Sequence, residues 1–139
     1  MIQIVLASHG DFCLGLKQSL EMIAGKTSDL VAMPFRLGED PQQYRDELSK
    51  VLGKRTTLVL VDLKGGTPYN SALFLSSEKS LKVVTGVNLP MLLAVVTSRN
   101  EHSKIQELVD IVTDSTNSGI EEMSLGGSPH REKLSVNKN

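Results

Sequence analysis

Short apolar runs alternate along this chain with longer segments in which apolar residues recur at helical spacing. The clearest runs are Ile2–Ala7 and Thr57–Val61, and neither contains a charged residue. Runs of this kind are typical of strands that helices cover on both faces, as in a parallel sheet. Two more strands are predicted at Leu30–Phe35, which contains Pro34, and at Leu81–Val87.

Helix-start signals lie between the predicted strands. Asp40 precedes Pro41, which places an acidic N-cap before a proline at the first helical position. Asn88 can cap another helix, and Ser103 with Gln106 forms a capping box. The predicted helices span Phe12–Ile23, Pro41–Leu52, Tyr69–Ser77, Leu89–Thr97 and Lys104–Ser118.

This alternation predicts an α/β fold, with a doubly wound, mainly parallel sheet of four strands and helices on both faces. A short last strand is expected at Ile120–Leu125. We assign residues 1–125 to one domain and the polar residues 126–139 to a flexible tail or a truncated linker. In a 2-1-3-4 strand order, the loops after the first and third strands meet at the switch point of the sheet.

Composition narrows the classes of function. The 139 residues suit one domain with a core, and the net charge of −1 gives no electrostatic case for binding nucleic acid or an anionic membrane. The longest apolar stretches are far shorter than the ~20 residues that span a bilayer. The N-terminal stretch lacks the basic start of a signal peptide. The single cysteine, Cys13, excludes an internal disulfide and fits a reducing, cytoplasmic location.

Residues that suit group transfer follow the first and third predicted strands. Ser8, His9 and Gly10 follow the first, and Asp62 follows the third. The carboxyl ends of the strands form the edge at which open α/β sheets bind ligands. A histidine that accepts a phosphoryl group needs one free ring nitrogen and an acceptor that holds the other as N–H. Asp62 can be that acceptor for His9.

The segment after the third strand offers donors for phosphoryl oxygens. Gly65 and Gly66 let the backbone turn its N–H groups inward as an anion-binding nest. Thr67 with Pro68 opens the third predicted helix, whose N-terminus is positive, and the Thr67 hydroxyl can cap that helix or bind phosphate. The candidate phosphate-binding residues are Gly10, Gly65, Gly66 and Thr67.

Each of these features also has a purely structural interpretation. A histidine at a strand end is often a satisfied surface group, an aspartate after a strand is often a turn residue, and Gly-Gly-Thr-Pro is often a tight turn with a helix start. Elsewhere, Cys13 fits a small buried hydrophobe and Lys64 an exposed loop residue. His102 and His130 fit solvated side chains, and with Cys13 they form no metal-ligand spacing. We therefore expect no metal and no other cofactor.

Three segments carry a resemblance to a known family: ASHG at 7–10, VDLKGGTPYN at 61–70 and TGVNLPML at 85–92. In order and spacing, they resemble the enzyme IIA components of the mannose family of the bacterial sugar phosphotransferase system, over roughly residues 1–125. The resemblance implies phosphorylation of His9 on Nε2, with Asp62 at Nδ1 and Thr67 near the phosphoryl oxygens. Residues Gly86–Pro90 would line the same region and contribute to a homodimer, in which Ile120–Leu125 can be exchanged between subunits.

The resemblance also implies partners. The donor would be the histidine-containing phosphocarrier protein and the acceptor an enzyme IIB protein or domain, with membrane components IIC and IID engaged only indirectly. Sugar recognition would lie with those membrane components. Lys64 departs from the tryptophan that some members carry at its position, and the chain is expected to be either a free subunit or a piece of a longer protein.

Three alternatives compete with a transport role. The same site would occur in a regulatory IIA-like domain of a transcription regulator, where phosphorylation controls gene expression. A phosphohistidine phosphatase or mutase typically has Arg-His-Gly, whereas Ser8 stands at the arginine position here. A receiver domain phosphorylated on Asp62 would need an acidic pair after the first strand, where this chain has Ser8 and His9.

Overall fold

A computed structural model of the chain describes residues 1–126, and these residues form a four-stranded parallel sheet in the order β2-β1-β3-β4. The strands are β1 (Gln3–His9), β2 (Leu30–Phe35), β3 (Thr57–Val61) and β4 (Leu81–Thr85). This confirms the predicted α/β fold. Strand β1 lies between β2 and β3, so His9 pairs with Phe35 on one side while Ala7 pairs with Val61 on the other.

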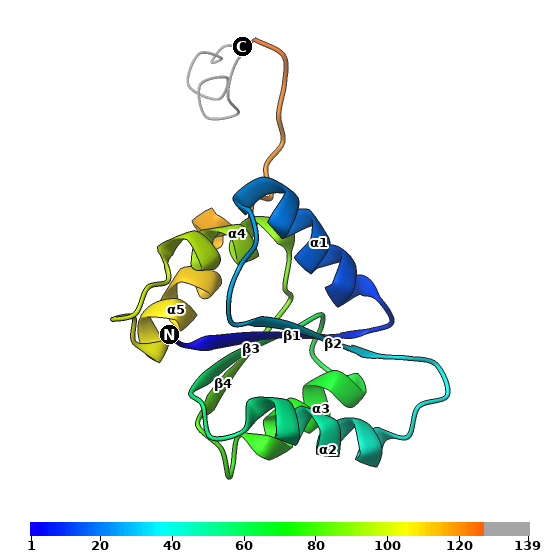
Figure 1. Cartoon of the computed structure of the whole chain (residues 1–139). Helices are drawn as coiled ribbons and strands as arrows, with labels where there is room; N and C mark the ends of the chain where they lie inside the picture. The colour runs from blue at the N-terminus through cyan, green and yellow to red at the C-terminus, as the bar shows by residue number, and fades with distance from the viewer. Residues whose placement is uncertain (127–139) are drawn as a thin grey trace.

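Helices cover both faces of the sheet. Figure 1 shows α1, α4 and α5 on one face and α2 and α3 on the other. The helices are α1 (Phe12–Ala24), α2 (Pro41–Leu52), α3 (Gly66–Leu75), α4 (Leu89–Ser98) and α5 (Ile105–Thr113), followed by a short 3-10 helix, η1 (Ser115–Asn117). Within residues 1–126, none of the helices has the length and apolar character needed to cross a membrane.

Side chains along the central strands point alternately to the two faces of the sheet, which divides the core into two layers. In β1, Ile4 and Leu6 pack toward α1 and α4, whereas Val5 and Ala7 pack toward α2 and α3. All four side chains are completely buried. Successive side chains of a strand point to opposite faces, so a strand that helices cover on both sides must be apolar throughout.

Two of the predicted helix starts are confirmed. The Asp40 carboxylate accepts a hydrogen bond from the Gln43 N–H at 3.2 Å, and the Asn88 side chain accepts one from the Met91 N–H at 3.0 Å. Each side-chain oxygen satisfies a first-turn N–H that has no partner within its own helix.

The start of α3 differs from the prediction. The helix begins at Gly66 with Gly65 as N-cap, three residues before the predicted start at Tyr69, and no side chain in the described part of the chain caps it. Thr67 therefore lies inside the first turn and is not the cap. Gly65 and Gly66 have φ angles of +117° and +81°, a conformation that glycine adopts without the steric penalty of a Cβ atom.

The predicted capping box of α5 is also wrong. The helix begins at Ile105, and the Glu107 carboxylate accepts from the Lys104 N–H at 2.9 Å. The Ser103 hydroxyl instead accepts from the Asn100 N–H, which stabilises the preceding turn. The helix ends at Thr113 rather than at the predicted 118, because the chain then tightens into η1.

The expected last strand is not formed within the single chain. Between residues 120 and 125, only Ser124 takes part in an isolated bridge. Ile120, Met123 and Leu125 are exposed by 85%, 64% and 105% of their reference areas. The segment therefore buries none of its large apolar side chains in the described part of one subunit.

Candidate functional site

His9 and Asp62 meet at the carboxyl edge of the sheet, where β1 and β3 end. Oδ2 of Asp62 lies 2.8 Å from Nδ1 of His9 and also accepts the backbone N–H of His9 at 2.9 Å. The His9 side chain is 47% exposed, whereas that of Asp62 is only 12% exposed. A carboxylate acceptor holds Nδ1 as N–H, so Nε2 is left as the nitrogen with a free lone pair.

The environment of Asp62 favours its ionised form. Burial alone would raise the pKa of the carboxyl, but hydrogen bonds from the His9 backbone, the His9 ring and the Leu63 backbone lower it, and the net pKa lies below the ordinary value. The Leu63 N–H reaches Oδ1 at 2.9 Å. Both carboxylate oxygens are thus occupied by donors, which fixes the orientation of the group.

Ser8 holds the turn that carries His9. Its side chain is fully buried, its hydroxyl donates to the Gly10 carbonyl at 3.1 Å, and its Oγ accepts from the Cys13 N–H at 2.9 Å. Asp11, the N-cap of α1, makes no side-chain capping bond. Ser8 therefore supplies the cap that α1 otherwise lacks and ties the helix start to the end of β1.

Phe35 contacts the ring of His9 from the neighbouring strand. The two ring centroids lie 6.4 Å apart with an interplanar angle of 79°, an edge-to-face arrangement. Phe35 in turn lies edge-to-face with the buried Tyr44, at 5.3 Å, and the Tyr44 hydroxyl donates to the Met33 carbonyl at 2.6 Å. An anchored aromatic pair thus lies beside the histidine.

Gly66 approaches the other side of the ring. A Cβ atom placed on Gly66 would lie 2.5 Å from Nε2 and 2.7 Å from Cε1 of His9. Only a residue without a side chain fits there. The first-turn N–H groups of Gly66 and Thr67 have no acceptor within α3, and Pro68 has no N–H, so the positive end of α3 lies beside Nε2.

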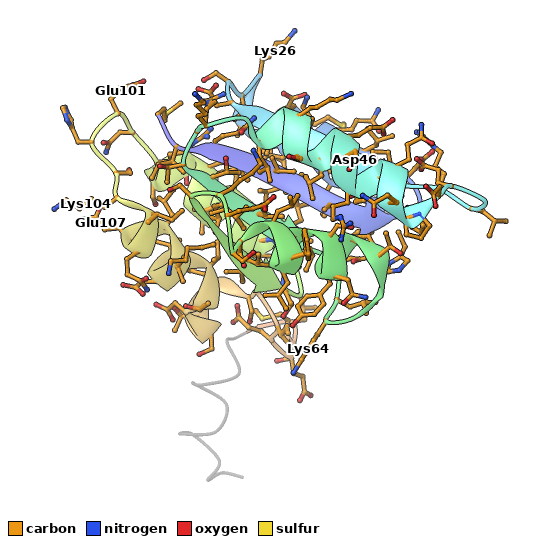
Figure 2. All side chains as sticks on the ribbon, turned by 90° about the horizontal axis from the view of Figure 1, so that it is seen from below. Lys26, Asp46, Lys64, Glu101, Lys104 and Glu107 are labelled. Carbon is orange, nitrogen blue, oxygen red and sulfur yellow. The ribbon has the colours of Figure 1, made fainter. Side chains whose placement is uncertain are left out.

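The structure places the remaining candidate residues differently. Gly10 follows His9 with a φ of +59°, and its N–H donates to the Phe35 carbonyl at 2.7 Å rather than standing free for a ligand. The side chain of Thr67 lines a hollow between α2 and α3. Lys64 is exposed and projects away from the body of the domain (Figure 2).

The segment Gly86–Pro90 lies next to the end of β3. The Val87 N–H donates to the Val61 carbonyl at 3.0 Å, one residue before Asp62. Gly119 packs closely on Pro90, because a Cβ atom on Gly119 would lie 2.6 Å from Cγ of the proline. The segment after η1 thus starts beside the segment that the resemblance places near the site.

Sequence reasoning missed the contact of Phe35 with His9, and it missed that Ser8 caps a helix. Ser8 precedes the histidine, and a small polar residue that ends a buried strand is a weak signal for a helix cap. Phe35 carries no local signal, because its contact with His9 depends on the pairing of β1 with β2.

These features define a class of protein, a doubly wound α/β domain with a histidine at the switch point of its sheet. The histidine is half-exposed and is hydrogen-bonded to a carboxylate. A helix that begins with glycine lies against the other ring nitrogen, which is free. The family EIIA-man, described as the PTS system fructose IIA component, matches residues 3–113. The chain belongs to this family and is a IIA component of a sugar phosphotransferase system.

Characterised relatives agree with this assignment. The chain is 39% identical over 115 residues to the PTS system fructose-specific EIIA component of Bacillus subtilis, covering 79% of this chain and 78% of that protein. It is 30% identical over 124 residues to the PTS system mannose-specific EIIAB component of Escherichia coli, covering 86% of this chain but only 38% of that protein.

Solved structures share the fold over nearly the whole domain. The phosphotransferase system component EIIA from Streptococcus agalactiae has a TM-score of 0.81 at 39% identity, covering 88% of this chain and 97% of that one. The mannose/sorbose specific IIA subunit from Enterococcus faecalis has the same TM-score at 30% identity, covering 91% of this chain and 97% of that one.

Proposed function

We propose that the chain receives a phosphoryl group on Nε2 of His9 from the histidine-containing phosphocarrier protein and passes it to an enzyme IIB protein or domain. The observation that carries this proposal is the 2.8 Å contact between Asp62 and Nδ1, which leaves Nε2 as the nucleophilic nitrogen. We expect the exchange to take place in the cytoplasm, within a domain that spans residues 1–125.

In the first step, the Nε2 lone pair attacks phosphorus while the bond from phosphorus to the donor's histidine nitrogen breaks. The return of that electron pair to the donor ring balances the step. Transfer between two imidazoles is nearly balanced in energy, so the protein must chiefly align the two nitrogens and spread the charge on the passing group. We expect the first-turn N–H groups of Gly66 and Thr67 to bind the phosphoryl oxygens.

Asp62 has two effects in this scheme. As a carboxylate it keeps the proton on Nδ1, and its negative charge makes Nε2 a better nucleophile. The same charge lies near the phosphoryl group after transfer and favours its release to the acceptor. Thr67 is proposed to assist with its backbone N–H, and with its hydroxyl once a partner is docked.

The test is phosphorylation of the full chain by the donor protein in the presence of a phosphoenolpyruvate-driven donor system. His9→Ala should remove all stable label, whereas His102→Ala should be labelled like the wild type, since His102 lies in an exposed segment. Mass spectrometry of the labelled chain should locate the added group on His9. Undiminished labelling of His9→Ala rejects the proposal.

We also propose that the protein is a homodimer in which residues 120–125 are exchanged. The exposure of Ile120, Met123 and Leu125 supports this, because apolar side chains that one subunit leaves open can be buried by a second. Light scattering should give twice the 15.1 kDa mass of the chain. The double variant with Met123→Asp and Leu125→Asp should shift it toward the monomer, and an unchanged mass would reject the exchange.

The relatives named above are components of sugar systems, so the regulatory alternative is not favoured.

A further inference from the structure

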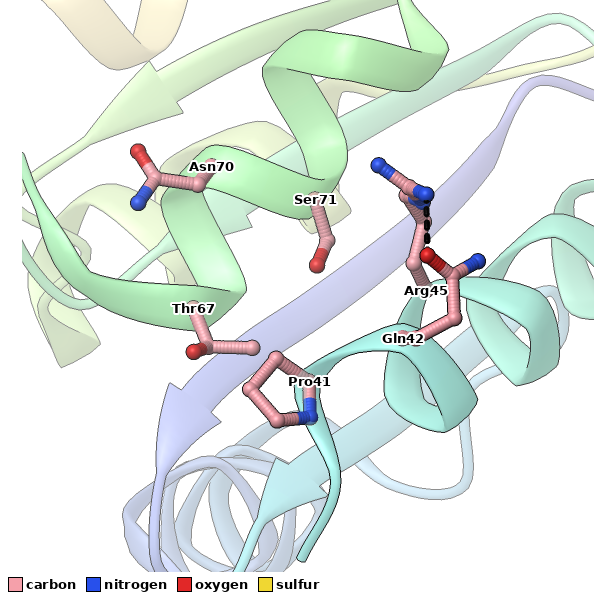
Figure 3. Close-up of a pocket in the computed structure, with 6 residues that line it drawn as sticks. All are labelled: Pro41, Gln42, Arg45, Thr67, Asn70 and Ser71. Atoms are coloured by element: carbon pink, nitrogen blue, oxygen red, sulfur yellow. Dashed lines mark hydrogen bonds between the residues drawn. The ribbon is translucent and has the colours of Figure 1, made fainter.

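A hollow of about 190 Å³ lies between α2 and α3 (Figure 3), and its lining includes Thr67 but not His9. Its lining residues are Pro41, Gln42, Arg45, Thr67, Asn70 and Ser71. Drug-sized ligands take pockets of roughly 300–1,000 Å³, so a hollow of this size suits a much smaller molecule.

Ser71 brings a hydroxyl group to this hollow. The residue is only 5% exposed, and Figure 3 shows its hydroxyl pointing into the space between the two helices. No side-chain hydrogen bond joins this hydroxyl to any other residue of the described range 1–126. Within residues 1–126, the only buried side-chain polar atom without a hydrogen-bond partner is Nε of Arg99, so the Ser71 Oγ is open to solvent in the hollow, where a ligand can replace water as its partner.

Arg45 provides a cation that is already held in place. Its guanidinium carbon lies 4.0 Å from the centroid of the Phe74 ring, and its Nη2 donates to Oε1 of Gln42. The Gln42 amide nitrogen in turn donates to Asp46 at 3.1 Å. A guanidinium has five N–H groups, so donors remain for an anion after these contacts.

The rest of the lining sets the character of the ligand. Arg45 is charged, and no carboxylate belongs to the lining set. At the other end, Figure 3 shows the methyl group of Thr67 and the ring of Pro41 facing one another. The hollow therefore combines a cation and a hydroxyl at one end with an apolar slot at the other.

We propose that this hollow binds a small oxyanion: a free carboxylate or phosphate compound of a few carbon atoms. Arg45 would pair with the charged group, the Ser71 hydroxyl would donate to it, and Pro41 with Thr67 would contact its apolar part. Thr67 follows Gly66, whose backbone lies against His9, so the occupant would touch the segment that completes the phosphoryl site.

Nuclear magnetic resonance titration of the full chain with acetate and with inorganic phosphate, at constant ionic strength, tests the proposal. We expect saturable shifts of the Arg45 and Ser71 amides with at least one of the two anions. Arg45→Gln should weaken the affinity about tenfold or more, and Ser71→Ala several-fold. Lys50→Gln removes an exposed cation from the same helix and should leave the affinity unchanged.

Three results would overturn the proposal. Shifts that grow linearly without saturation indicate no site. An equal loss of anion affinity in Arg45→Gln and in Lys50→Gln indicates general electrostatic attraction to a basic surface. Shifts confined to Gly66 and its neighbours, and insensitive to Arg45→Gln, place the anion beside His9 instead. None of these results bears on phosphorylation of His9, so the proposed function is tested separately.

Discussion

Asp62 binds His9 at two points: one carboxylate oxygen lies 2.9 Å from the backbone nitrogen and 2.8 Å from Nδ1 of the ring. The two residues are 53 positions apart in the chain, and the pairing of β1 with β3 brings them together. The backbone contact anchors the carboxylate, and the ring contact sets which nitrogen of His9 carries the proton. Rotation of the ring away from Asp62 would break the second contact and leave the tautomer unspecified.

Asp62→Asn tests whether the negative charge of the carboxylate, and not only its shape, is needed for phosphorylation of His9. The amide has the same size but carries no charge, so it stabilises the Nδ1–H tautomer less. We expect the rate of His9 phosphorylation to fall by about 10–100-fold while the circular dichroism spectrum is retained. Asp110→Asn, on the distant helix α5, is the control and should transfer at the wild-type rate. A rate for Asp62→Asn within twofold of wild type would contradict the assigned role.

Stability should depend on pH through the same carboxylate. The hydrogen bonds from His9 and Leu63 lower the pKa of Asp62 in the folded protein, so the folded state holds this proton less tightly than the unfolded state does. The resulting stabilisation is complete when the pH is above 3.8, the ordinary pKa of an aspartate. It is lost as the pH falls through the lower pKa that Asp62 has in the folded protein.

Urea denaturation of the wild type and Asp62→Asn between roughly pH 5 and pH 3 measures this effect. The difference in their free energies of unfolding should shrink as the pH falls. A difference that stays constant over this range would show that the carboxyl has the same pKa in both states.

Gly66→Ala tests the close approach of α3 to His9. The added Cβ would collide with Nε2, and a displacement of about 1 Å at a reacting centre costs roughly 100-fold in rate. Gly25→Ala is a matched control, because Gly25 has a φ of +83° against +81° for Gly66 and nothing lies within 4 Å of its Cβ position.

Gly25→Ala should lose about 1–2 kcal/mol in the free energy of unfolding, because it places a side chain at a positive φ angle. Gly66→Ala should lose at least as much, since its Cβ atom also displaces the His9 ring. Only Gly66→Ala should lose phosphorylation. Equal rates in the two variants would mean that the contact with Nε2 has no part in transfer.

Ser8→Ala should weaken the link between β1 and α1. The Cys13 N–H loses its acceptor, and no other side chain of residues 1–126 caps this helix, so we expect a loss of about 1–2 kcal/mol in the free energy of unfolding. Ser19→Ala, within the same helix, should change stability by less than about 0.5 kcal/mol. Thermal or chemical denaturation of the two variants checks this, and equal losses would argue against the capping role.

The strands and most helices were predictable from the sequence because their signals are local. The apolar runs at Ile2–Ala7 and Thr57–Val61 became the two central strands, and Asp40 and Asn88 cap helices as predicted. The prediction failed where two local signals competed. Thr67 before Pro68 suggests an N-cap, yet the helix starts earlier because the two glycines preceding Thr67 accept positive φ angles.

The candidate site was predictable only together with an assumed strand order. The sequence alone determined that His9 and Asp62 each end a buried strand, since apolar runs and polar ends are properties of neighbouring residues. The tertiary structure decided that these strands are adjacent, that Phe35 lies against the His9 ring, and that Gly66 leaves no room for a side chain beside Nε2. These relationships depend on the order and register of strands that are distant in sequence, and no local spacing encodes them.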